Sequence, residues 1–263
     1  MSEENKKSSR IKNRDIETKT EKNKLVFVSF LIVLLLFGLY VITQKQPKLQ
    51  SYENNEENNV YTLLEISDED FLNKIKFGST EEIKQMINSG ANVKAVDPKG
   101  RNAFSIASIF NGKPEVAKVL KNGGVNINAQ DANGYTPLML SVLSGGNSYP
   151  FVQELLKLGA STKLTTRSGI STLSVAAGST VDERVIEALI KHGADVNHKN
   201  KDGSTAILVA AKITTNPKVI ETLLKNGAKT KAKDLGVSVY SVAITNPNLS
   251  TDKKLMEKLK KLR

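Results

Sequence analysis

The chain of 263 residues has no cysteine, no tryptophan and only two histidines. Without cysteine it forms no disulfide, carries no thiolate nucleophile and offers no cysteine-bound zinc site. With two histidines, the most common general base and metal ligand is nearly absent as well. Basic residues, in contrast, are abundant: 38 lysines and arginines stand against 27 acidic residues, a formal net charge of +11. These absences exclude many enzyme classes and leave binding as the more promising activity.

One uncharged stretch, LVFVSFLIVLLLFGLYVIT at residues 25–43, interrupts an otherwise polar N-terminal region. As a helix it would be about 28 Å long, close to the hydrocarbon thickness of a bilayer. A cleaved signal peptide is the alternative, but its apolar run is usually shorter and is followed by small residues at a cleavage site. The sequence VITQKQP offers no such site. We therefore predict an uncleaved transmembrane helix, a signal-anchor, at Leu25–Thr43.

The charges on either side of this segment predict its orientation. Residues 5–24 contain eight lysines and arginines, whereas residues 44–63 contain two. By the positive-inside rule, the basic and disordered tail at 1–24 stays in the cytoplasm and the remainder is exported. Residues 44–62 are polar and lack hydrophobic periodicity, which predicts a flexible linker. The sequence thus indicates a single-pass membrane protein, best suited to a bacterial inner membrane with its domain in the periplasm.

Residues 63–263 repeat with a period near 34. One column of glycines contains Gly100, Gly134, Gly169, Gly203 and Gly236. A second column contains Gly90, Gly123, Gly159, Gly193 and Gly227. Two independent registers with the same period indicate a repeat array.

The sequence pattern within each repeat predicts two helices and a turn. Two residues after each glycine of the first column stands a good helix N-cap, namely Asn102, Thr136, Ser171, Thr205 and Ser238. The second helix shows an i, i+3, i+4 apolar stripe, and a proline stands near its start in three repeats, where a missing N–H group costs little. The last segment, TDKKLMEKLKKLR, places Leu255, Met256, Leu259 and Leu262 on one face and lysines on the other, as a terminal repeat requires. The sequence therefore predicts an all-α solenoid of about six helix-loop-helix units.

This pattern resembles the ankyrin repeat family over residues 63–263. Its clearest pieces are DANGYTPLMLS at 131–141 and LIKHGADVNHKNKDGSTAILVAA at 189–211. One repeat keeps the Thr-Pro-Leu of the family, and none has the histidine that follows it, so a hydrogen bond between turn and helix is missing. The resemblance implies an ankyrin-type α-solenoid whose turns and first helices form a concave surface that binds protein partners.

The two histidines fall within the repeat pattern, which predicts a structural role for them and not a catalytic or metal-binding one. His192 occupies a column that asparagine and leucine fill in other repeats, and Asp195, Asn197 and Asp202 are expected to hydrogen-bond the backbone of their turn. A serine triad needs a histidine with an orienting acid, and neither histidine is placed to serve. We expect no enzyme activity, no catalytic residue, no metal site and no cofactor.

Binding residues are expected at turn tips and at first-helix positions that packing does not use. They are Lys99, Arg101, Asn133, Tyr135, Arg167, Ile170, Lys201, Ser204, Leu235 and Val237. Tyr135, together with Arg101 and Arg167, is the best predicted anchor, because Tyr and Arg dominate interface energetics. From residue 61 onward, 28 basic residues stand against 19 acidic ones, which favours an acidic protein partner or an anionic surface. Nucleic acid is disfavoured, since no aromatic platform or recognised motif accompanies the lysines.

The sequence thus predicts a membrane-tethered ankyrin repeat domain that acts as a protein–protein interaction scaffold. Two alternatives stay open. One is an inhibitor or immunity-like protein that covers an acidic enzyme site. The other is an electrostatic binder of anionic lipid or nucleic acid, whose binding would weaken steeply with salt.

Overall fold

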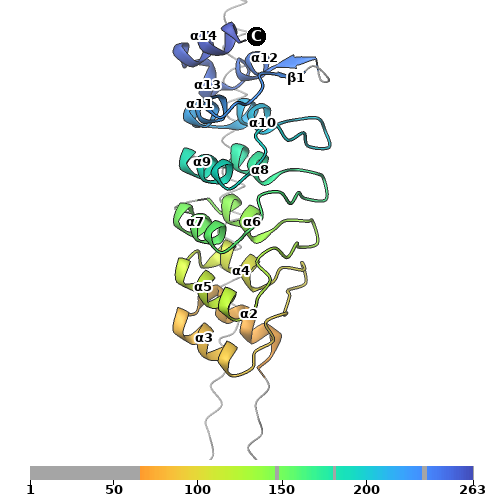
Figure 1. The fold of residues 1–263 in the computed structure, drawn as a ribbon, viewed down its shortest axis with the longest axis vertical. Helices are drawn as coiled ribbons and strands as arrows, with labels where there is room; N and C mark the ends of the chain where they lie inside the picture. The colour runs from red at the N-terminus through yellow and green to blue at the C-terminus, as the bar shows by residue number, and fades with distance from the viewer. Residues whose placement is uncertain (1–65, 146–147, 180–181, 233–235, 263) are drawn as a thin grey trace, which may run out of the picture. The chain divides into compact units, whose positions relative to one another are not determined.

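The computed structural model describes residues 66–145, 148–179, 182–232 and 236–262, all within one compact unit of the chain, Leu63–Arg263. Helices stack there in chain order, two rows deep (Figure 1). The inner row comprises α2 (Asp68–Phe77), α4 (Ala103–Phe110), α6 (Pro137–Leu143), α8 (Thr172–Ser179), α10 (Ala206–Ile213) and α12 (Val239–Ala243). The outer row comprises α3 (Thr80–Asn88), α5 (Pro114–Asn122), α7 (Tyr149–Lys157), α9 (Glu183–Lys191), α11 (Pro217–Lys225) and α14 (Lys253–Lys261), with the short α13 (Pro247–Ser250) before α14. The predicted helical repeat solenoid is confirmed.

The expectation of a purely helical fold needs one correction. Strand β1 (Lys231–Ala232) pairs antiparallel with β2 (Val237–Ser238) in the last turn. Two earlier turns contain an isolated antiparallel bridge at the corresponding place, between Val96 and Asn102 and between Thr165 and Ser171. The turn before an inner helix is therefore a small hairpin, because its two arms run close enough to share backbone hydrogen bonds.

The predicted N-caps hold in most repeats. Side-chain oxygens that accept from a first-turn N–H group belong to Asn102, Thr136, Ser171 and Ser238. Thr205 is the exception: its hydroxyl is buried and makes no hydrogen bond within the described residues. The backbone there still begins a helix, so the apolar face of α10 and not the cap determines where this helix lies.

The second glycine column is shifted by one residue in one repeat. Gly123 keeps a helical φ of −74°, whereas Gly124 has the left-handed φ of +82°. With Gly124 in the column, the intervals become 34, 35, 34 and 34, more regular than the sequence predicted. The assignment of Gly123 to this column was therefore wrong, and the more regular spacing of Gly124 was the sequence signal that favoured its neighbour.

The core lies between the two rows and between successive repeats. Inner helices are apolar around most of their circumference because neighbours enclose them; in α4 the residues 103–108 are all buried. Asn111 donates from Nδ2 to the carbonyl of Ile75 in the preceding repeat, at 3.1 Å. Asn246 does the same to Ala211 and Thr214. These asparagines supply ties between neighbouring repeats in a fold that lacks the family's histidine.

The terminal helix α14 buries Leu255 and Leu259, each 1% exposed. Leu262, predicted on the same buried face, is instead 42% exposed because it lies beyond the last helical turn. Among the described residues, no helix is both long enough and apolar enough to span a membrane. The predicted tail at 1–24, transmembrane helix at Leu25–Thr43 and linker at 44–62 lie outside the described residues.

Candidate functional site

The turn tips form a continuous line along one edge of the stack (Figure 1). The backbone N–H of Ala132 donates to the carbonyl of Lys99 at 2.9 Å, and that of Arg167 donates to Asn133 at 3.0 Å. Lys201 extends the line by donating from Nζ to the carbonyl of Arg167 at 2.7 Å. The structure thus brings four predicted binding residues, Lys99, Asn133, Arg167 and Lys201, into one row with exposed side chains. This row is called the tip line below.

An acidic side chain organises each of the first two turns of this line. Oδ1 of Asp97 accepts from the backbone N–H groups of Lys99 and Arg101, each at 2.9 Å. Asp131 holds the next turn in the same way, accepting from Asn133 and Tyr135. Because a carboxylate that accepts two N–H groups fixes the backbone, the tip line is a preformed surface.

Arg101 is held against its own turn by Asp97. Its Nε lies 2.7 Å from Oδ2 of Asp97, and the two side chains are only 17% and 14% exposed. Burial alone would raise the pKa of Asp97, but hydrogen bonds from the Arg101 guanidinium and from nearby backbone N–H groups outweigh it and lower the pKa below its ordinary value. The carboxylate therefore stays charged and keeps Arg101 folded against its own turn.

The variant Asp97→Asn tests this tie. At pH 7 it should lower the free energy of unfolding by about 1–2 kcal/mol, because the asparagine keeps an acceptor oxygen but loses the charge that strengthens these hydrogen bonds. Since the folded pKa of Asp97 is depressed, the wild-type advantage is fully present above the unfolded pKa, near 4. It is lost as the pH falls through the lower folded pKa. Urea unfolding at pH 7 and pH 2.5 measures this; an equal difference at both pH values would contradict it.

The remaining predicted residues lie beside the tip line in different settings. Tyr135 and Ile170 are half-buried, and Val237 is 36% exposed on β2. The Ser204 hydroxyl donates from Oγ to Oδ1 of Asp202 at 2.6 Å. This hydrogen bond and a second one from the backbone N–H of Ser204 lower the pKa of the Asp202 carboxyl. Leu235 lies outside the described residues. That these residues bind a partner stays a prediction.

Both histidines hydrogen-bond the backbone. Nδ1 of His192, at the C-cap of α9, lies 2.8 Å from the carbonyl of Ala188. Nε2 of His198 lies 3.2 Å from the carbonyl of Gly169 in the preceding turn. Asn197, expected to bond its own turn, instead contacts the next repeat, donating to Gly227 and accepting from the N–H of Lys229. The described residues contain no group of three or more metal-ligating side chains.

Sequence reasoning missed a second surface at the other end of the inner helices. Large apolar side chains stand exposed at or just after the last residue of α2, α4, α6, α10 and α12: Phe77 (72% exposed), Phe110 (46%), Leu143 (45%), Ile213 (52%) and Ile244 (52%). These five residues, called the apolar row below, include most of the large exposed apolar side chains of the described residues. The spacing of 33 between Phe77, Phe110 and Leu143 was a sequence signal, but periodicity alone does not tell an exposed helix end from a packed one.

The apolar row has no large apolar member at the end of α8. In α8 the last residue is the polar Ser179, and a Cβ added at the preceding Gly178 would lie 2.9 Å from Cδ1 of Ile213, so Ile213 covers this glycine. Lys76 places its Nζ 6.0 Å from the ring centroid of Phe110. Between the ends of α4 and α6 lies a cavity of about 240 Å³, lined in part by Phe110, Asn111 and Ser144. It is smaller than a typical ligand pocket and suits a single inserted side chain.

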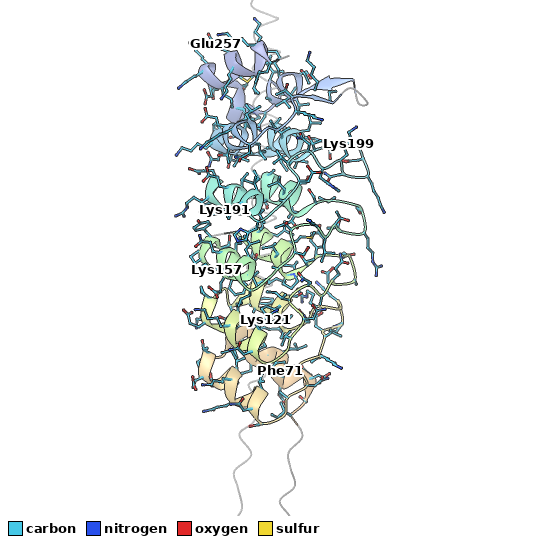
Figure 2. The ribbon with its side chains drawn as sticks, in the orientation of Figure 1. Phe71, Lys121, Lys157, Lys191, Lys199 and Glu257 are labelled. Atoms are coloured by element: carbon cyan, nitrogen blue, oxygen red, sulfur yellow. The ribbon has the colours of Figure 1, made fainter. Side chains whose placement is uncertain are left out.

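The outer helices present a different, charged surface. Figure 2 shows Lys157 and Lys191 on the outer row, on the opposite side of the stack from the turn residue Lys199. A lysine in the last turn of α5, α7, α9 and α11 complements the partial negative charge of each helix end. The outer row therefore presents a basic surface to solvent.

Residues 71–166 and 144–234 match the family model described as ankyrin repeats (3 copies). The two matches together span residues 71–234, more than half of the chain. No curated protein matches the chain.

Proposed function

Because this chain belongs to the ankyrin repeat family, whose repeats are generally protein–protein interaction domains, we propose that it is a non-enzymatic scaffold that holds a partner protein. The observation that carries the proposal is the apolar row, five large apolar side chains between 45% and 72% exposed along neighbouring inner helices. Solvated helix ends do not need such side chains, and a repeated apolar surface of this kind marks an interaction site.

Energetics assign different roles to the two surfaces. Burying the exposed part of one half-exposed Leu, Ile or Phe contributes about 1 kcal/mol. Several members of the apolar row must therefore be covered together to offset the entropy of association. The tip line is basic at Lys99, Arg167 and Lys201, which favours an acidic partner and governs its rate of approach and its selection. The apolar row supplies affinity, and the tip line supplies specificity.

We further propose that the chain is anchored in a membrane by Leu25–Thr43, with residues 1–24 in the cytoplasm and the repeats exported. The length and lack of charge of that segment support it, as do eight basic residues before it against two after it. A bacterial inner membrane with a periplasmic domain fits this charge pattern. The linker at 44–62 would give the domain a reach of about 25 Å if it is a random coil.

The orientation is tested with reporters fused after Arg263. A reporter active only outside the cytoplasm should give signal, and one active only inside should not. The reverse result would overturn the proposed orientation and leave the partner surface untouched, since that surface rests on residues of the repeats alone.

The partner surface is tested with the double variant Phe110→Ser, Leu143→Ser in the full chain. Protein recovered with the tagged chain from gently solubilised membranes is quantified by mass spectrometry. The variant should lower recovery of specific partners at least tenfold, since it removes two adjacent side chains of the apolar row. The matched control Lys118→Ser, Lys157→Ser, on exposed positions of the outer row, should leave recovery within twofold. Unchanged recovery with the first variant would contradict the proposal.

A further inference from the structure

Four lysines line a large cavity near the C-terminal end of the stack. Its volume is about 620 Å³, and its charged lining consists of Lys225, Lys229, Lys231 and Lys258. These lysines come from the end of α11, the turn after it, strand β1 and helix α14. Residues far apart in the sequence thus meet at one place. The name lysine cavity is used for this site below.

The charge of the lysine cavity is not balanced within the described residues. No acidic side chain lines it, and none of its four lysines makes an ion pair in the part of the chain that the structure describes. Four like charges around one cavity repel each other and create a positive potential that an anion would relieve. The cavity is therefore electrostatically prepared for an anion.

Helix-end chemistry accounts for only part of this cluster. Lys225 and Lys258 lie near helix C-termini, where a cation is favourable for the helix itself. Lys229 and Lys231 lie outside any helix. In the preceding repeat, 34 residues earlier, their positions are occupied by Asp195 and Asn197. Lys229 is thus a local departure from the repeat pattern, whereas Lys231 occupies a column that Lys94 and Lys163 fill in earlier repeats.

One wall of the lysine cavity is apolar. Leu224, Ala228 and Leu262 form it, and Leu262 is 42% exposed. Thr230 donates from Oγ1 to the carbonyl of Leu262 at 2.9 Å and so fixes this wall against the turn. The volume lies within the range of sites that hold a drug-sized ligand. A ligand that fits must combine an anionic group with an adjoining apolar part.

We propose that the lysine cavity binds a phosphate monoester that carries acyl chains, an anionic lipid of the phosphatidate type. Lysine is an established phosphate binder that acts as a point charge, and four lysines line the cavity. A dianionic phosphate gains more from four lysines than a monoanion does. The apolar wall receives the start of the acyl chains. No member of the apolar row lines this cavity, so the inference does not depend on the partner surface.

Calorimetric titration of the full chain in neutral detergent provides the test, with three probes. Dihexanoyl phosphatidate carries both features, glycerol 3-phosphate carries only the phosphate, and dihexanoyl phosphatidylcholine carries the chains without net charge. Phosphatidate should bind at least tenfold more tightly than either of the others. Equal binding of glycerol 3-phosphate would overturn the lipid assignment, and equal binding of phosphatidylcholine would overturn the anion site.

A pair of charge-matched variants locates the binding. The variant Lys225→Gln, Lys229→Gln, Lys231→Gln, Lys258→Gln should weaken phosphatidate binding at least tenfold. The control Lys94→Gln, Lys118→Gln, Lys121→Gln, Lys157→Gln removes the same charge from exposed positions elsewhere and should change binding less than twofold. Equal losses in both variants would show that net charge alone attracts the lipid and would overturn the site. Circular dichroism of both variants establishes that each is folded.

Discussion

Replacing Gly134 by alanine should lower the free energy of unfolding by about 3 kcal/mol. Gly134 has a φ of +83°, a conformation that costs an L-residue about 1–2 kcal/mol. A Cβ there would also lie 2.5 Å from the backbone nitrogen of Arg167 in the next repeat. That nitrogen donates the hydrogen bond to Asn133 that joins two turns of the tip line. The methyl group must push the turns apart, so strain and a lost hydrogen bond add together.

Gly124→Ala is the matched control, because it separates backbone strain from crowding. Gly124 has nearly the same φ, +82°, but a Cβ there would have nothing within 4 Å. It should cost only about 1 kcal/mol. Urea unfolding of the full chain, followed by circular dichroism, measures both variants. Equal losses would contradict the close approach of neighbouring turns on which the tip line depends.

Phe104→Ala should cost about 4 kcal/mol, the second large effect that the structure predicts. Phe104 is 0% exposed in α4, between neighbouring inner helices and the outer row. Removing a buried phenyl ring forfeits its transfer free energy and leaves a cavity that stacked helices cannot close. The loss should appear as a lower urea midpoint or as early unfolding of the flanking repeats.

Phe110 lies in the same helix and serves as the exposed counterpart to which the buried Phe104 is compared. It is 46% exposed, so Phe110→Ala should cost less than about 1 kcal/mol while it weakens partner binding. A phenylalanine that is needed for binding but not for folding is what the apolar row requires. If Phe110→Ala destabilised the domain as much as Phe104→Ala, the row would be part of the core and the proposed surface would fail.

Local chemistry made most of the fold predictable. In most repeats a cap residue such as Asn102 or Ser171 marks the start of the inner helix, and a glycine marks the turn. Caps and turns depend only on neighbours within a few residues, so the sequence predicts them. Two local predictions failed: Thr205 does not cap its helix, and Gly123 was placed in a column that belongs to the adjacent Gly124.

The candidate surfaces were less predictable, because exposure is a tertiary property. The tip line followed from turn positions, but the ion pair that commits Arg101 to Asp97 depends on side-chain geometry. The apolar row has the periodicity of core residues, and only the ends of stacked helices leave it uncovered. The lysine cavity joins Lys225 with Lys258, which come together only after the last repeat has folded.

Position-specific photo-crosslinking in living cells tests the central claim most directly, that a partner protein covers the apolar row. A photoreactive residue at Phe110 or Leu143 should crosslink the full chain to a discrete protein, and the same residue at Lys118 on the outer row should not. Crosslinks that arise only from Lys118, or equally from all three positions, would contradict a partner held by the inner helices.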